Sequence, residues 1–334
     1  MKKWIFKFGI LALVTFHLES PQAFAYYSTD ESSCSSIDFR NTFPLATRNQ
    51  EGLSWCFAHS AADYLQYTFQ IPVQLSAADI AINYSKSNWS RLVHFFTHLV
   101  DGSLRGQPPQ TGIAQAAIKL ILPQGYCPES ALPSDFWNRV DSATGEQKKE
   151  EILQSILDMY SLQKDIQAGI YSSPADLPFY FSFLHVSRED FFNLLQNSSH
   201  NKLLLKLRNQ ACSLERKPFP GNPISVNFKL RGRHVFQRMN DSFDRSMPVT
   251  VDFFASLLKD YESRAKDITS FHTVLLYGRK FDPATQQCTY LLKNSWGTEC
   301  TRYDPRIECE HGYLWIAENK LFPNMTSQLI INRE

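Results

Sequence analysis

Residues 49–62 read Asn-Gln-Glu-Gly-Leu-Ser-Trp-Cys-Phe-Ala-His-Ser-Ala-Ala. This run places one thiol, Cys56, near the start of an expected helix, with Ser54 as candidate N-cap and apolar residues at helical spacing over 57–65. A cysteine in a first helical turn lies near unpaired backbone N–H groups and the positive end of the helix dipole. Both stabilise the thiolate, which is the nucleophilic form. The run therefore predicts a reactive cysteine, although a lone cysteine is more often a buried structural residue.

Two later stretches carry a histidine and an amide in equally distinctive settings. Residues 271–278 read Phe-His-Thr-Val-Leu-Leu-Tyr-Gly, an apolar strand with His272 near its start. Residues 290–297 read Tyr-Leu-Leu-Lys-Asn-Ser-Trp-Gly and contain Asn294. Taken alone, a histidine before an apolar strand is more often structural, and an asparagine is more often a turn residue. Their joint occurrence with the thiol of 49–62 favours a catalytic interpretation.

Taken in order, Gln50, Cys56, His272 and Asn294 resemble the catalytic set of the papain-like cysteine peptidases. The most specific part of the resemblance is the Asn-Ser-Trp-Gly block, which a Gly-Tyr pair follows further along the chain. The resemblance implies an α+β, papain-like two-domain fold. Its left-hand domain is helical, and its right-hand domain is an antiparallel β-sheet or barrel.

The resemblance, together with the residue pattern of the N-terminus, divides the chain into four segments. Residues 1–25 are expected to be a signal peptide, 26–133 the helical left-hand domain with Cys56, 134–216 a helical insertion, and 217–334 the β-rich right-hand domain. His272 follows Cys56 by 216 residues, whereas family members typically have about 130–150. The inserted segment accounts for the excess. We expect it to restrict access to the cleft, with a surface elaboration far from the site as the alternative.

Hydrophobic periodicity and the positions of capping and turn residues predict the secondary structure of these segments. Helices are expected at 54–69, 76–85, 91–100, 113–120, 145–170, 201–212 and near 235–243, with Ser187 capping a further one. Strands are expected at 224–230, 247–253, 272–276, 290–293, 312–317 and 328–331.

The resemblance assigns a role to each member of the catalytic set. Cys56 is the expected nucleophile and His272 the general acid and base, facing each other as thiolate and imidazolium. Asn294 is expected to hold the imidazole in one tautomer. Gln50 and the backbone N–H of Cys56 are expected to donate to the oxyanion.

The resemblance also points to residues that border the substrate. We expect contacts from Gly112 and Thr111, which occupy the position of a paired glycine, and from Phe271, which stands where a short polar residue is usual. Trp296 is expected to lie beside the cleft and to shield the histidine from water.

Length, composition and charge limit which other functions are expected. The chain has 334 residues, of which 43% are hydrophobic, and a net charge of +1. That length suffices for one large or two modest cores, and the balanced charge argues against a nucleic-acid partner. No cofactor is expected. His94 and His98 are four residues apart, but no further ligand accompanies them, so they are expected to be ordinary packing residues and not a metal site.

The N-terminus predicts export. Basic residues up to Lys7 precede a short apolar run, and Ala23-Phe24-Ala25 fits a cleavage site. The mature chain is then expected to be secreted or periplasmic, with no membrane association. Seven cysteines in an exported chain suit three disulfides and one free thiol. If Cys56 is free, six cysteines allow 15 pairings, of which Cys300 with Cys309 is the best single expectation.

The leading hypothesis is a secreted cysteine peptidase that acts on peptide or protein substrates. Two alternatives remain open: a catalytically idle domain that binds peptides, and an acyltransferase that passes the same thioester to an amine. The sequence leaves cleavage specificity and oligomeric state open.

Overall fold

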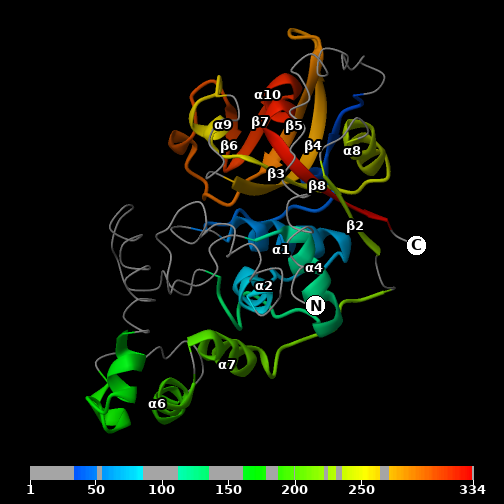
Figure 1. Ribbon diagram of the computed structural model, residues 1–334. Helices are drawn as coiled ribbons and strands as arrows, with labels where there is room; N and C mark the ends of the chain where they lie inside the picture. Colours follow the sequence, from blue (N-terminus) through cyan, green and yellow to red (C-terminus); the bar gives the residue numbers. More distant parts are fainter. Residues whose placement is uncertain are drawn as a thin grey trace, which may run out of the picture.

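The described residues form a helical part built on α1 and an antiparallel sheet that packs against it (Figure 1). This is a computed structural model, and it describes residues 34–50, 55–85, 112–134, 161–177, 187–198, 200–221, 225–230, 235–263 and 271–332. The helices of the first half and the sheet of the second half confirm the predicted α+β fold class.

Helix α1 (Cys56–Thr68) lies between the two parts, and all of its residues are buried. Its apolar spacing predicts one buried stripe, but α1 contacts α2 and α4 on one side and strands β3 and β4 on the other. Small residues such as Ala58 and Ala61 let these neighbours approach closely. Polar residues on α1 therefore need buried partners, and Ser60 finds one by donating to the backbone carbonyl of Thr273 at 2.9 Å.

The ends of the first helices follow local capping rules unevenly. Helix α2 (Ala77–Tyr84) begins at the predicted cap, because the Ser76 hydroxyl accepts a hydrogen bond from the backbone N–H of Asp79 at 2.9 Å. The prediction of Ser54 as the cap of α1 is wrong: the N-cap is Trp55, which makes no side-chain capping bond. Helix α4 (Ala114–Ile121) likewise begins without a side-chain cap. Burial against neighbours stabilises these two helix starts in place of a cap.

The sheet follows the order β2-β8-β3-β4-β5-β7-β6, and β1 pairs with β4. Every described pairing is antiparallel. Its strands are β1 (Ile37–Asp38), β2 (Ser225–Leu230), β3 (Val249–Phe254), β4 (Phe271–Asp282), β5 (Gln287–Lys293), β6 (Glu308–Glu310), β7 (Tyr313–Ala317) and β8 (Met325–Asn332). Three helices accompany it: α8 (Val235–Asp244), α9 (Ser256–Lys259) and α10 (Glu318–Asn324).

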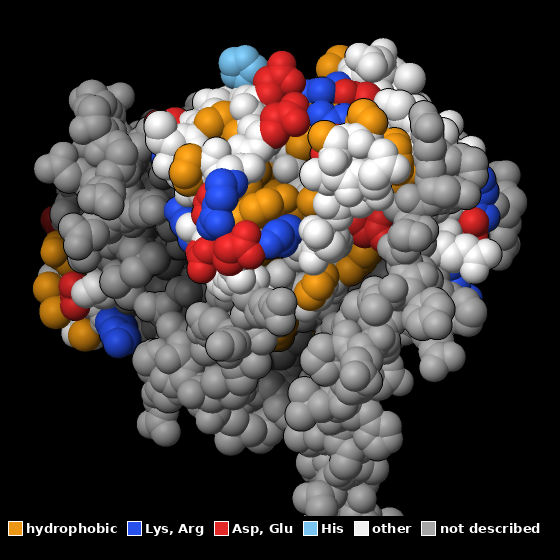
Figure 2. Space-filling view, turned by 90° about the horizontal axis from the view of Figure 1, so that it is seen from above, with side chains coloured by type: hydrophobic (Ala, Val, Ile, Leu, Met, Phe, Trp, Pro, Cys, Tyr) orange, Lys and Arg blue, Asp and Glu red, His pale blue; other side chains and the backbone are white. Residues whose placement is uncertain are grey.

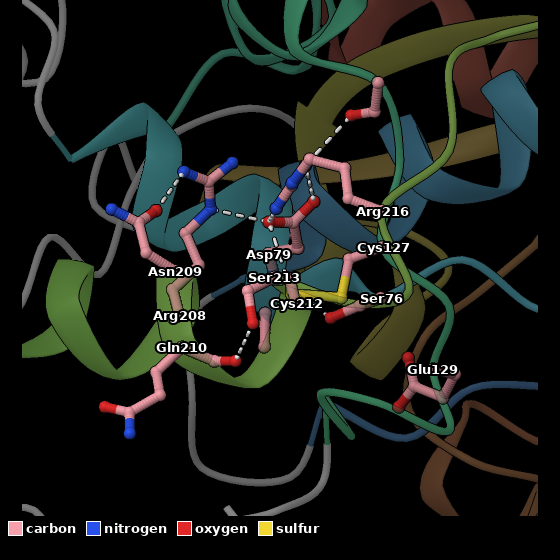
Figure 3. The surroundings of a disulfide bond; sticks show 12 residues. Ser76, Asp79, Cys127, Glu129, Arg208, Asn209, Gln210, Cys212, Ser213 and Arg216 are labelled. Atoms are coloured by element: carbon pink, nitrogen blue, oxygen red, sulfur yellow. Dashed lines mark hydrogen bonds and ion pairs between the residues drawn. A yellow bond between two sulfur atoms is a disulfide. The ribbon is translucent and has the colours of Figure 1, made fainter. Parts of the chain in front are cut away.

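Part of the 134–216 segment is attached firmly to the helical part. Helices α6 (Arg188–Asn197) and α7 (His200–Cys212) lie on the side of α2 that faces away from the sheet (Figure 1). The buried Asp79 carboxylate accepts from Arg208 at 2.5 Å and from Arg216 at 2.6 Å, beside the Cys127–Cys212 disulfide (Figure 3). Arg208 of α7 is thus ion-paired with Asp79 of α2, and the disulfide joins the last residue of α7 to Cys127, which follows α4.

The cysteine framework has the predicted form. Cys300 pairs with Cys309, Cys34 pairs with Cys288, and Cys127 pairs with Cys212. Cys56 is the free cysteine. The prediction of three disulfides and one free thiol is therefore confirmed, as is the pairing across the short loop.

Some expectations fall on other parts of the chain. The signal segment 1–25, the helix 91–100 with His94 and His98, and most of the helix 145–170 lie outside the described residues. None of the helices in the described ranges has the length and apolar character needed to span a bilayer. Seen from the sheet end, acidic and basic side chains lie next to one another around hydrophobic ones (Figure 2). Exposed ion pairs, such as Arg306 with Asp260 and Lys280 with Glu308, place opposite charges side by side.

Candidate active site

The free thiol lies where the helical part meets the sheet. Cys56 is the first residue of α1 and is 8% exposed. Its sulfur contacts the backbone and the side-chain hydroxyl of Thr273, and both contacts favour the thiolate. The structure therefore brings Cys56 to the residue that follows His272 on β4.

The imidazole of His272 is buried and fixed by one short hydrogen bond. Its Nε2 lies 2.6 Å from Oδ1 of Asn294, which follows β5. That amide is itself held, since Oδ1 also accepts from the backbone N–H of Ser295 at 2.8 Å and Nδ2 donates to the Tyr303 hydroxyl at 3.1 Å. Because an amide oxygen only accepts, His272 carries its proton on Nε2 and leaves a lone pair on Nδ1.

Trp296 covers this pair from one side. Its ring centroid lies 4.9 Å from that of His272. It also lies 5.8 Å from that of Tyr303, and the planes of the Trp296 and Tyr303 rings are only 2° apart. The Lys259 ammonium lies 5.2 Å from the same indole centroid. Trp296 thus packs where the sequence places it, against the histidine and beside its asparagine.

Gln50 is held by Ser295, next to Asn294. The Ser295 hydroxyl donates to Gln50 Oε1 at 2.6 Å, and the Gln50 backbone N–H donates to the Ser295 carbonyl at 2.7 Å. The carbonyl end of the amide is therefore occupied, and Nε2 is the end left to donate to a ligand. Sequence reasoning missed Ser295 as a partner, although it lies inside the quoted Asn-Ser-Trp-Gly block.

A buried ion cluster lies behind the site. Asp63 of α1 accepts from Arg48 at 2.6 Å and from Lys293 of β5 at 2.5 Å, and all three side chains are at most 6% exposed. Lys293 directly precedes Asn294. The cluster therefore ties the helix that carries Cys56 to the strand that leads to Asn294.

Burial changes the expected protonation of the reacting pair. The pKa of Cys56 is raised to about 11, because desolvation and the nearby Asp252 charge outweigh the hydrogen bonds from Thr273 and Phe57. Desolvation lowers the pKa of His272 to about 4, against the opposing effect of Asn294. The expected thiolate–imidazolium pair is therefore not the favoured state, and at neutral pH the site holds a thiol and a neutral imidazole. Local helix-start effects are outweighed here by tertiary burial.

The residues expected to border the substrate are only partly brought together. Phe271 is 54% exposed beside His272. Gly112 packs against Phe57, the neighbour of Cys56, so closely that an added Cβ would lie 2.7 Å from the ring. Thr111 lies outside the described residues. Asp252, which is near enough to influence the thiol, was missed because its place beside Thr273 depends on strand register.

No group of three histidine, cysteine, aspartate or glutamate side chains within the described ranges is arranged to hold a metal ion. The described arrangement consists of a thiol, an imidazole and amides, which are the groups needed for nucleophilic acyl chemistry.

A second buried histidine predicts loss of stability in acid. The pKa of His59 on α1 is lowered to about 3 by desolvation and by Arg48, whereas 6.5 is ordinary. Between these two pH values the unfolded chain therefore binds more protons than the folded chain. The contribution of His59 to the free energy of unfolding is full above pH 6.5 and falls by roughly 1.4 kcal/mol per pH unit below it. His59→Phe should reduce this slope by about one proton, measured by urea unfolding between pH 7 and 4. An unchanged slope would contradict the assignment.

Comparisons with known proteins complete the description of the site. No family model and no curated protein sequence matches the chain. Among solved structures, it is similar to the bromelain protease of Ananas comosus, with 14% identity over 90% of this chain and 99% of that one and a TM-score of 0.41. It is also similar to digestive procathepsin L 3 of Tenebrio molitor, with 15% identity, coverage of 92% and 73%, and a TM-score of 0.45. A structure on the mite allergens Blo t 1 and Der p 1 gives 14% identity, coverage of 94% and 74%, and a TM-score of 0.44. These solved structures are of the papain-like kind that Gln50, Cys56, His272 and Asn294 resemble in their sequence settings.

Proposed function

We propose that this chain is a cysteine peptidase that hydrolyses peptide bonds through a thioester on Cys56. One observation carries the proposal. The thiol left out of the three disulfides begins a buried helix and contacts Thr273, whose neighbour His272 is held by Asn294. A structural cysteine would need no such neighbours.

The protonation of the site indicates how the reaction would begin. His272 Nδ1 accepts the thiol proton while the sulfur attacks the carbonyl carbon of the scissile bond, so charge separates only as the bond forms. The imidazolium then returns its proton to the leaving amine. Water, deprotonated by the same Nδ1, attacks the thioester carbonyl; the C–S bond breaks, the acid leaves, and the imidazolium returns the proton to the Cys56 sulfur. Asn294 keeps Nε2 protonated throughout.

The oxyanion is assigned two donors. Gln50 Nε2 is available because Ser295 occupies the other end of the amide, and the backbone N–H of Cys56 belongs to the unpaired first turn of α1. Donors of this kind contribute roughly 3 kcal/mol each to the transition state. Ser295 is a positioning residue in this scheme.

The same proposal includes export. Three disulfides are typical of proteins that fold in an oxidising compartment. The signal expected at 1–25 gives the route, and mass spectrometry of the N-terminus of the mature protein would test it.

The experiment that tests the function compares wild type with Cys56→Ser on a proteome-derived peptide library. We expect wild type to produce new peptide termini and Cys56→Ser to produce none above background. Cut sites shared by both proteins would refute the assignment. Added amine would distinguish acyl transfer, since amide products would then replace part of the free acid.

A further inference from the structure

The register of β3 and β4 builds a patch of mixed character beside Cys56. Asp252 pairs with Thr273, and Phe254 pairs with Phe271. Residues two apart on a strand share a face, so the four side chains lie together. We call these four residues the β3–β4 patch.

Asp252 is the charged member of this patch and lies close to the nucleophile. Thr273 Oγ1 donates to its carboxylate at 2.6 Å, and the same threonine contacts the Cys56 sulfur. The Asp252 charge raises the pKa values of both Cys56 and Tyr84. Asp252 is half-buried, where charge interactions are stronger than in free solution.

The aromatic members of the patch lie at its open end. The rings of Phe254 and Phe271 are 5.2 Å apart, and Phe271 is 54% exposed. Aromatic faces favour the aliphatic stem and the positive head of lysine or arginine. The Asp252 carboxylate thus matches the charged head of a basic side chain, and the rings of Phe254 and Phe271 match its aliphatic stem.

We propose that Asp252 determines specificity by binding a lysine or arginine side chain of the substrate next to the bond that Cys56 attacks. The inference rests on the proposed function in so far as the bound peptide is a substrate. The preference for a basic side chain can be measured by binding alone and does not require turnover. An acidic side chain in the same place would face the Asp252 carboxylate and be rejected.

The test uses matched peptides that carry lysine, norleucine or glutamate at one position, scanned along the residues around the cut. Wild type should cleave the lysine series with kcat/KM about ten- to hundredfold above the norleucine series at one position, the size of one charge-assisted hydrogen bond. Asp252→Asn, which can still accept from Thr273, should abolish this ratio. Glu189→Gln on α6 removes an exposed carboxylate of the same charge and should keep it.

The outcomes separate this proposal from the proposed function. Cleavage that depends on Cys56 without preference for lysine overturns the role of Asp252 and leaves the peptidase intact. If no peptide is cut, Cys56→Ala is titrated with the lysine and norleucine peptides by fluorescence anisotropy. Tighter binding of lysine peptides, lost in Cys56→Ala with Asp252→Asn, supports the proposal for a binding protein. Equal binding, or none, overturns it.

Discussion

Replacing His272 by alanine should lower kcat/KM for peptide hydrolysis by roughly 10⁴-fold or more, the usual effect of removing one member of a catalytic set. The reason lies in the protonation of the site. The thiol is held neutral by burial, and Nδ1 of His272 is the base to which the proposal assigns its proton. The measurement is single-turnover and steady-state cleavage of one fluorogenic peptide.

The histidine variant should remain folded. His272 is buried and neutral, and its loss removes a hydrogen bond to Asn294 but no ion pair. Added imidazole, which fits the vacated space, should restore part of the activity. Activity within tenfold of wild type in the folded variant would exclude His272 as the base.

Replacing Asp63 by asparagine should have the largest effect on stability. Arg48 and Lys293 both bind this carboxylate in the interior, so its removal leaves two buried cations close together, with only the longer 3.6 Å contact of Arg48 to Glu129 remaining. Breaking a buried ion pair by removing one partner costs about 3–5 kcal/mol. The free energy of unfolding, from urea titration at pH 7, is the measurement.

Lys293→Met is the matched control for this cluster. It removes one cation and leaves Asp63 paired with Arg48, and an apolar side chain fills the buried space. The loss should be clearly smaller than for Asp63→Asn. Equal losses would mean that packing at α1 and β5, and not charge balance, governs the stability of this region.

The members of the site could be predicted because each lies at the end of a helix or strand that the local residue pattern indicates. Cys56 begins its helix, His272 lies near the start of β4, and Asn294 follows β5, as the residue patterns indicate. The free thiol also follows from an odd cysteine count. Such features need only local chain geometry and composition.

Other features depend on which elements pack together, which no local pattern contains. The neutral state of Cys56 results from burial between two parts of the fold, whereas the sequence shows only the helix start. Asp252 became part of the site through its register with Thr273. Helix α10 was missed because it is short and includes Pro323, which local rules place at a break.

The central claim is a covalent thioester on Cys56, and its most direct test is intact and peptide mass spectrometry of the enzyme quenched in acid during turnover of a slow ester substrate. The account predicts one acyl group on the peptide that contains Cys56, absent in Cys56→Ser and accumulating when deacylation is slowed. Turnover with an unmodified Cys56 peptide, or with the acyl group on another residue, would contradict it.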